Sequence, residues 1–146
     1  MVADDVAAVR RGLEFAVKAY EDFQLVGAAA DGHEAIELCL MLTPDVVLLD
    51  ADMPRVCSVA VARFVNWLCP ETQVIGMMAF DDDDMAQKLK CNGVSDCLYK
   101  NISAEELSGA IRRAYQRRKP VHVSNGTMPG FPCPGQGCPR EWRCSD

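Results

Sequence analysis

Three acidic residues and one lysine follow the ends of apolar runs, where the side chains of a parallel sheet can do chemistry. Asp4 and Asp5 come after the first three residues, and Asp50 ends the run VVLLD. Lys100 follows the run DCLY. Three carboxylates close together repel one another unless a cation joins them, and oxygen ligands with room for water suit Mg²⁺. We therefore interpret Asp50 as a nucleophile that attacks phosphorus and forms an acyl phosphate, whose charge the metal and Lys100 would share.

The segments that must position these groups alternate between strand and helix. Residues 45–50 and 73–79 are continuous apolar runs typical of strands buried on both faces of a parallel sheet, and residues 24–30 form a weaker strand pattern. Only residues 1–3 precede the acidic pair, so the first strand is expected to be very short. Helices are predicted where apolar residues recur at three- and four-residue spacing, at 9–20, 33–42 and 59–68.

The rest of the chain continues this alternation. Residues 81–90 should form a helix that Gly93 closes, because glycine readily adopts the positive φ found after helix ends. A last strand is expected at residues 96–99. Ser103 begins the pattern Ser-Ala-Glu-Glu, which predicts a capped helix that stops before Pro120.

This regular order favours an α/β fold: a doubly wound, five-stranded parallel sheet with helices on both faces, the flavodoxin-like arrangement. With a strand order of 2-1-3-4-5, the first and third strands are neighbours, and functional groups gather beyond the carboxyl ends of the strands. Asp4, Asp5 and Asp50 should then lie together at one edge of the sheet, with Lys100 at the end of the fifth strand.

Composition and charge limit the classes of function that the chain can have. The chain has 146 residues, of which 49% are hydrophobic and 25% charged, which suits one soluble domain with a sizeable core. No apolar run approaches the length of a membrane span. The opening MVADDVAAVR carries acids where a signal peptide carries basic residues, so we expect a cytoplasmic protein with no membrane association. A net charge of −6 argues against a nucleic-acid groove on the main body.

The composition changes at Pro120. Residues 1–119 are expected to form one domain, whereas residues 120–146 are rich in proline, glycine and cysteine and are interpreted as a largely disordered tail. We expect no DNA-binding domain in this chain. The tail has no CxxC pair, which disfavours a zinc site there. The cysteines before the tail are interpreted as small reduced residues, mostly in the core: Cys39, Cys57, Cys69, Cys91 and Cys97.

The segment VVLLDADMP resembles the phosphoacceptor segment of CheY-like receiver domains. The acidic pair, the Met53-Pro54 turn and the lysine in CLYKN match that family in the same order, over about residues 1–119. The resemblance is closest to receivers of the NarL/LuxR type in AADGHEAIEL, AFDDDD and ISAEEL. An Asp-Asp pair alone would also serve as a helix cap, but the ordered set favours a receiver.

The resemblance implies roles for individual residues. Asp50 would accept a phosphoryl group in a Mg²⁺-dependent reaction assisted by Lys100. Asp5 would ligate the metal directly and Asp4 through water, and Asp50 and the backbone carbonyl of Asp52 would complete the protein ligands. The expected function is that of a response regulator in a two-component phosphorelay, which signals through protein contacts and is not itself an enzyme.

Partners follow from the same resemblance. It implies a sensor histidine kinase as the phosphoryl donor. It also implies a homodimer or an output protein bound to the face formed by the fourth helix, the fifth strand and the fifth helix.

Two positions depart from the family pattern. Met78 stands where the family has Ser or Thr at the end of the fourth strand, so one hydrogen bond to the phosphoryl group is missing. Cys97 stands three residues before the lysine, where the family has the aromatic residue of the switch. Tyr99 is offset by two residues and should face the same side of the strand.

These departures favour a second hypothesis, a pseudo-receiver that binds partners without being phosphorylated. A third is the receiver part of a truncated NarL/LuxR-type transcription regulator. A fourth is an enzyme, because Asp50-Ala51-Asp52 resembles the DxD nucleophile motif of haloacid-dehalogenase-type phosphatases. That motif usually opens the chain, and the remainder here leaves little room for a cap and a later acidic loop.

Overall fold

The computed structural model describes residues 1–54 and 56–118. Arg55 and residues 119–146, which hold the expected tail, lie outside the described residues. The strands are β1 (Val2–Ala3), β2 (Ala28–Ala29), β3 (Val46–Asp50), β4 (Gln73–Met78) and β5 (Asp96–Tyr99). The helices are α1 (Ala7–Lys18), α2 (Gly32–Leu42), α3 (Ser58–Leu68), α4 (Asp83–Cys91) and α5 (Ala104–Gln116).

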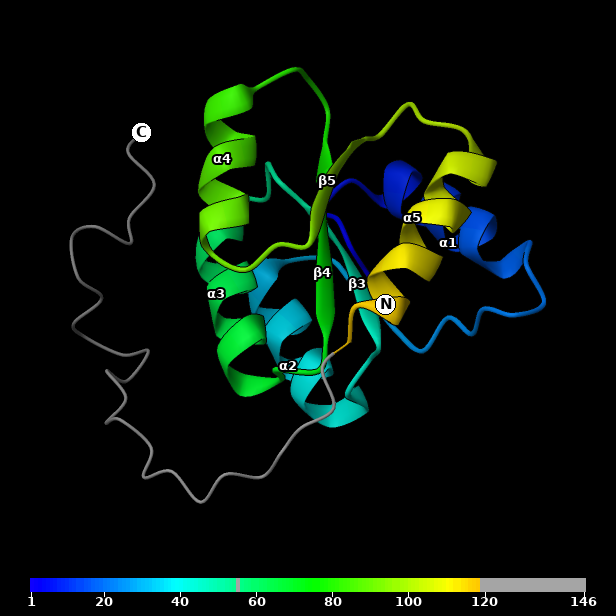
Figure 1. The fold of residues 1–146 in the computed structure, drawn as a ribbon, viewed down its shortest axis with the longest axis horizontal. Helices are drawn as coiled ribbons and strands as arrows, with labels where there is room; N and C mark the ends of the chain where they lie inside the picture. The colour runs from blue at the N-terminus through cyan, green and yellow to red at the C-terminus, as the bar shows by residue number, and fades with distance from the viewer. Residues whose placement is uncertain (55, 119–146) are drawn as a thin grey trace.

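The strands form one parallel sheet in the order β2-β1-β3-β4-β5, which confirms the fold expected from the alternating pattern. Helices α2, α3 and α4 cover one face, and α1 and α5 cover the other (Figure 1). Val47 and Leu49 of β3 pack into the core beneath the first group, and Leu48 packs into the core beneath the second. Because β3 is buried on both faces, all of its residues before Asp50 are apolar.

Local signals begin and end several helices as predicted. The Ser103 side chain accepts a hydrogen bond from the Glu106 amide and the Glu106 carboxylate returns one to the Ser103 amide, which forms the expected capping box at α5. Gly93 follows α4 with φ of 94°, where a Cβ would clash with the Asn66 side chain. Asp31 caps α2 through the amide of Glu34.

Some expectations were wrong in detail. The second strand is only Ala28–Ala29 rather than residues 24–30, because β1 offers just Val2 and Ala3 for pairing. Cys91 is exposed on α4, whereas Cys39 and Cys69 are in the core as expected. Among the described residues, no helix combines the length and the apolar character that crossing a membrane requires.

Candidate functional site

The carboxyl edge of the sheet brings three carboxylates together. Asp4 follows β1 and Asp50 ends β3, and both are almost completely buried, with 0% and 2% of their surface exposed. Asp5 is exposed beside them. One oxygen from each of the three carboxylates lies within 4.8 Å of the others. Oxygen ligands that are partly open to water fit Mg²⁺ better than a soft metal.

Lys100 joins the two buried carboxylates. Its Nζ lies 2.8 Å from Asp4 Oδ2 and 2.8 Å from Asp50 Oδ1. The backbone holds the lysine there, because the Lys100 amide donates to the Met78 carbonyl at the end of β4. Burial by itself would lower the pKa of Lys100, but hydrogen bonds to Asp4 and Asp50 outweigh it and hold the pKa above its ordinary value.

Backbone and side-chain donors fix the two carboxylates. The Val6 amide donates to Asp4 Oδ1 at 2.9 Å, and the Arg10 guanidinium donates to the Asp4 carbonyl at 2.7 Å. Asp4 is therefore bonded just ahead of α1, and the N-cap position is Val6, so the acidic pair does not cap this helix directly. The Asp52 amide donates to Asp50 Oδ1 at 3.1 Å. Sequence patterns did not single out Arg10, because its contact with Asp4 depends on the turn between β1 and α1.

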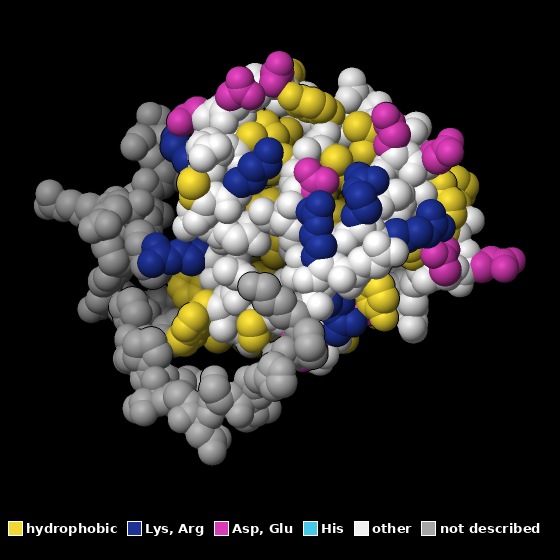
Figure 2. Space-filling model, viewed as in Figure 1, with side chains coloured by type: hydrophobic (Ala, Val, Ile, Leu, Met, Phe, Trp, Pro, Cys, Tyr) yellow, Lys and Arg dark blue, Asp and Glu magenta, His cyan; other side chains and the backbone are white. Residues whose placement is uncertain are grey.

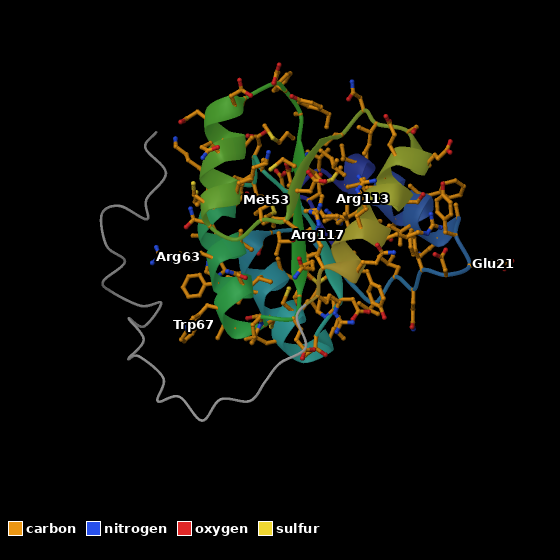
Figure 3. The ribbon with its side chains drawn as sticks, viewed as in Figure 1. Glu21, Met53, Arg63, Trp67, Arg113 and Arg117 are labelled. Atoms are coloured by element: carbon orange, nitrogen blue, oxygen red, sulfur yellow. The ribbon has the colours of Figure 1, made fainter. Side chains whose placement is uncertain are left out.

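The turn after β3 is anchored in the core. Asp52 is exposed, but Met53 is only 5% exposed and packs with the core between the sheet and helices α3 and α4 (Figure 3). The start of α2 packs closely on this loop and on α3, since a Cβ on Gly32 would lie 2.8 Å from Val56 of the loop and 2.8 Å from Val61 of α3. The backbone around Asp52 therefore has a defined place next to Asp50.

The two atypical positions pack on the α4 side of the sheet. Met78 is 4% exposed and belongs to that core. Cys97 is half-buried, with its Sγ 3.9 Å from the Ala86 carbonyl of α4. Gly76 lies opposite Cys97 on β4, where a Cβ would be 3.4 Å from the sulfur.

Tyr99 makes a contact that the sequence did not indicate. Its hydroxyl donates to Asp81 Oδ1 at 2.6 Å, from the end of β5 to the loop before α4. The hydrogen bond to Asp81 raises the pKa of Tyr99. The sequence placed Tyr99 on the same face as Cys97, but nothing in it marked Asp81 among four consecutive acids as the partner.

Charge is divided over the surface. Acidic side chains lie mainly along the upper and right edges in Figure 2, and basic side chains lie mostly in its middle. Figure 3 labels Arg113, which belongs to α5, and Arg117, which follows its end. Arg112 is exposed but pairs with Asp22 through two hydrogen bonds of 2.9 and 3.0 Å. Arg118 is half-buried and pairs with Asp45 at 2.6 Å. Arg112 and Arg113 thus lie on the exposed face of α5, and Arg117 and Arg118 follow its end.

Comparison with known proteins identifies the family to which this fold belongs. The family model of the response regulator receiver domain matches residues 1–112. The transcriptional regulatory protein YxjL of Bacillus subtilis is 34% identical over 113 residues, which cover 77% of this chain and 52% of that protein. The oxygen regulatory protein NreC of Staphylococcus epidermidis is 35% identical over 117 residues, which cover 80% of this chain and 54% of that protein. The chain therefore spans about half the length of the curated relatives it matches.

Solved structures agree with these matches. The receiver domain of NarL from Mycobacterium tuberculosis superimposes with a TM-score of 0.75 at 30% identity, over 80% of this chain and 94% of that one. The response regulator domain of Thermotoga maritima CheB gives a TM-score of 0.73 at 30% identity, over 79% and 93% of the two chains. The chain belongs to the family of response regulator receiver domains, the signalling modules of two-component systems, and is similar to their NarL/LuxR type.

Proposed function

We propose that Asp50 accepts a phosphoryl group in a Mg²⁺-dependent reaction. The observation that carries this proposal is the position of Lys100, whose ammonium lies 2.8 Å from both buried carboxylates beside the exposed Asp5. Burying two carboxylate charges lowers the stability of the folded protein, and binding a charged ligand would offset that cost. A surface acid at the end of a strand would need neither the burial nor the lysine.

Each residue then has a role in the transfer. An oxygen of Asp50 forms a bond to phosphorus while the bond to the donor's leaving group breaks, which gives an acyl phosphate. Lys100 neutralises charge on a phosphoryl oxygen. Asp5 would hold the metal directly and Asp4 through water, with Asp50 and the Asp52 carbonyl as further ligands. Bound Mg²⁺ would supply positive charge to the acceptor and the transferred group.

The partners follow from this reaction. Receiver domains take their phosphoryl group from sensor histidine kinases, so we assign that class of donor to this chain and place the exchange in the cytoplasm. We assign the output to the face of α4, β5 and α5, where a homodimer or another protein would bind. The curated relatives are regulatory proteins about twice as long as the match, so the domain of residues 1–119 would act as the receiver of a transcription regulator.

A second candidate is a pseudo-receiver that binds partners without phosphorylation. Two observations favour it. Met78 is buried and offers no hydroxyl, and Cys97 replaces the aromatic side chain of the switch. Under this hypothesis the acidic site would bind a metal, or Lys100 would stay paired with Asp4 and Asp50, and no phosphoryl group would be transferred.

Intact-mass measurement separates the two candidates. The protein is incubated with acetyl phosphate, with and without Mg²⁺, beside Asp50→Asn and Asp84→Asn. Asp84 is an exposed acid in the first turn of α4 and serves as the matched control. We expect one phosphoryl mass on the wild type and on Asp84→Asn with Mg²⁺, and none on Asp50→Asn. Equal labelling of all three proteins would remove Asp50 from the role, and no labelling of the wild type would favour the pseudo-receiver.

A further inference from the structure

Tyr99 links the end of β5 to the loop that leads into α4. Its hydroxyl donates to Asp81 Oδ1 at 2.6 Å, across 18 residues of sequence. The next residue is Lys100, whose amide donates to the Met78 carbonyl at 2.8 Å and whose ammonium contacts Asp50. Tyr99 is therefore bonded to the loop through its side chain and lies next to the lysine of the acceptor site.

The loop held by this bond begins beside the acceptor. Met77 of β4 lies opposite Asp50 of β3, and the Ala51 amide donates to the Met77 carbonyl at 2.9 Å. Residues 79–82 thus leave the sheet next to the end of β3. At the other end of the loop the Asp82 side chain caps α4 by accepting from the Met85 amide. The bond from Tyr99 to Asp81 secures the loop between these two fixed ends.

The position of this loop affects phosphoryl transfer because Met78 lacks a hydroxyl group. A thioether has no hydrogen to donate, so the end of β4 can offer a phosphoryl oxygen only backbone N–H groups from the residues that follow. Backbone donors stabilise charge well only when the surrounding structure holds them in place. A loop that is free to move would lose that advantage.

We infer that Tyr99 is a positioning residue for phosphoryl transfer to Asp50, acting through its hydrogen bond to Asp81 and the loop of residues 79–82. The inference rests on the proposed phosphoacceptor function. It gives Tyr99 a task separate from the switch position, which Cys97 occupies.

The test compares Tyr99→Phe, Asp81→Ala and the double variant with the wild type. Phenylalanine keeps the ring and removes only the donor, and Tyr115→Phe is the control, because Tyr115 is an exposed tyrosine of α5 stacked under Arg118. The rate of labelling by acetyl phosphate is measured at saturating Mg²⁺, and the dissociation constant for Mg²⁺ is measured separately. Amide chemical shifts of residues 79–83 report the loop in the absence of any donor.

We expect Tyr99→Phe to slow labelling about three- to tenfold, as the loss of one solvent-exposed hydrogen bond of ordinary strength would do. Asp81→Ala should match it and the double variant should be no slower, because both changes break one contact. The affinity for Mg²⁺ should stay constant and the loop amides should shift, while Tyr115→Phe should behave as wild type. Normal labelling by Tyr99→Phe would overturn the role of Tyr99 alone. A wild type that takes no label would overturn the proposed function and this role with it.

Discussion

Lys100 is the residue on which the charge balance of the site depends. Asp4 and Asp50 are buried, and each has an oxygen 2.8 Å from the ammonium. With the nearby Asp5, three carboxylates and one ammonium leave two negative charges, which one divalent cation would neutralise. Without Lys100 and without a bound cation, repulsion among the three carboxylates should therefore destabilise the folded protein.

Lys100→Met should lower the free energy of unfolding by about 3 kcal/mol without Mg²⁺, because it leaves two buried carboxylates unpaired. Urea denaturation at neutral pH measures this, and added Mg²⁺ should recover part of the loss. Since the pKa of Lys100 is raised, its pairing is complete below the ordinary pKa of 10.5 and is lost as the pH rises through the higher folded value. Lys88→Met is the control, because Lys88 pairs with Asp84 on the surface and should matter little. Equal stability of Lys100→Met and the wild type would contradict this balance.

Met78 determines how strongly phosphorylation can act on α4. A hydroxyl at this position would give the phosphoryl group a charge-assisted hydrogen bond worth about 1.5 to 3 kcal/mol, enough to shift a two-state switch about tenfold or more. Met78→Thr should therefore enlarge the amide shifts across residues 81–115 when beryllofluoride and Mg²⁺ are added. Mg²⁺ binding should change little, because the proposed ligands lie on other strands. A wild type that already shifts strongly, with no gain in the variant, would show that the thioether does not weaken the switch.

At the scale of elements, local sequence patterns predicted strands and helix ends. Features that depend on contacts between elements were not predicted. The run VVLLD marks β3, and the Ser103 pattern marks the start of α5, because burial and capping leave a signal at each residue. The length of β2 depends on how many residues β1 offers, which no pattern within 24–30 records. The bond from Tyr99 to Asp81 joins a strand to a loop and depends on the fold as a whole.

The capping box at α5 gives an element-scale prediction. Ser103→Ala should lower the free energy of unfolding by about 1 kcal/mol, because the Glu106 amide loses its acceptor. Ser103→Asn should stay close to the wild type, since asparagine also caps helix ends. Urea denaturation of the three proteins measures the difference. If alanine and asparagine destabilise the protein equally, the cap is not the cause.

At the scale of the whole molecule, the described residues hold both apolar cores and all the residues of the site. The two cores are continuous with β3 and β4, and α5 closes the second through Leu107, Ala110 and Ala114. Arg118 then pairs with Asp45 and Glu71 at the opposite edge of the sheet from the site. The contacts described at the acidic site are all made among residues 1–118.

A chain that ends at Lys119 should therefore unfold at the same urea concentration as the full chain and accept label at the same rate. Comparing the two proteins side by side tests the proposed domain boundary. A truncated chain that is less stable or labels more slowly would show that residues 120–146 contribute to the domain.

The most direct measurement locates the phosphoryl group itself. Protein labelled with acetyl phosphate and Mg²⁺ is treated with borohydride, which reduces an acyl phosphate of aspartate to homoserine, and peptides are then sequenced by mass spectrometry. We predict homoserine at Asp50 and unchanged aspartate at Asp4 and Asp5. Homoserine at Asp4 or Asp5, or a labelled protein with unchanged aspartate at Asp50, would contradict the account.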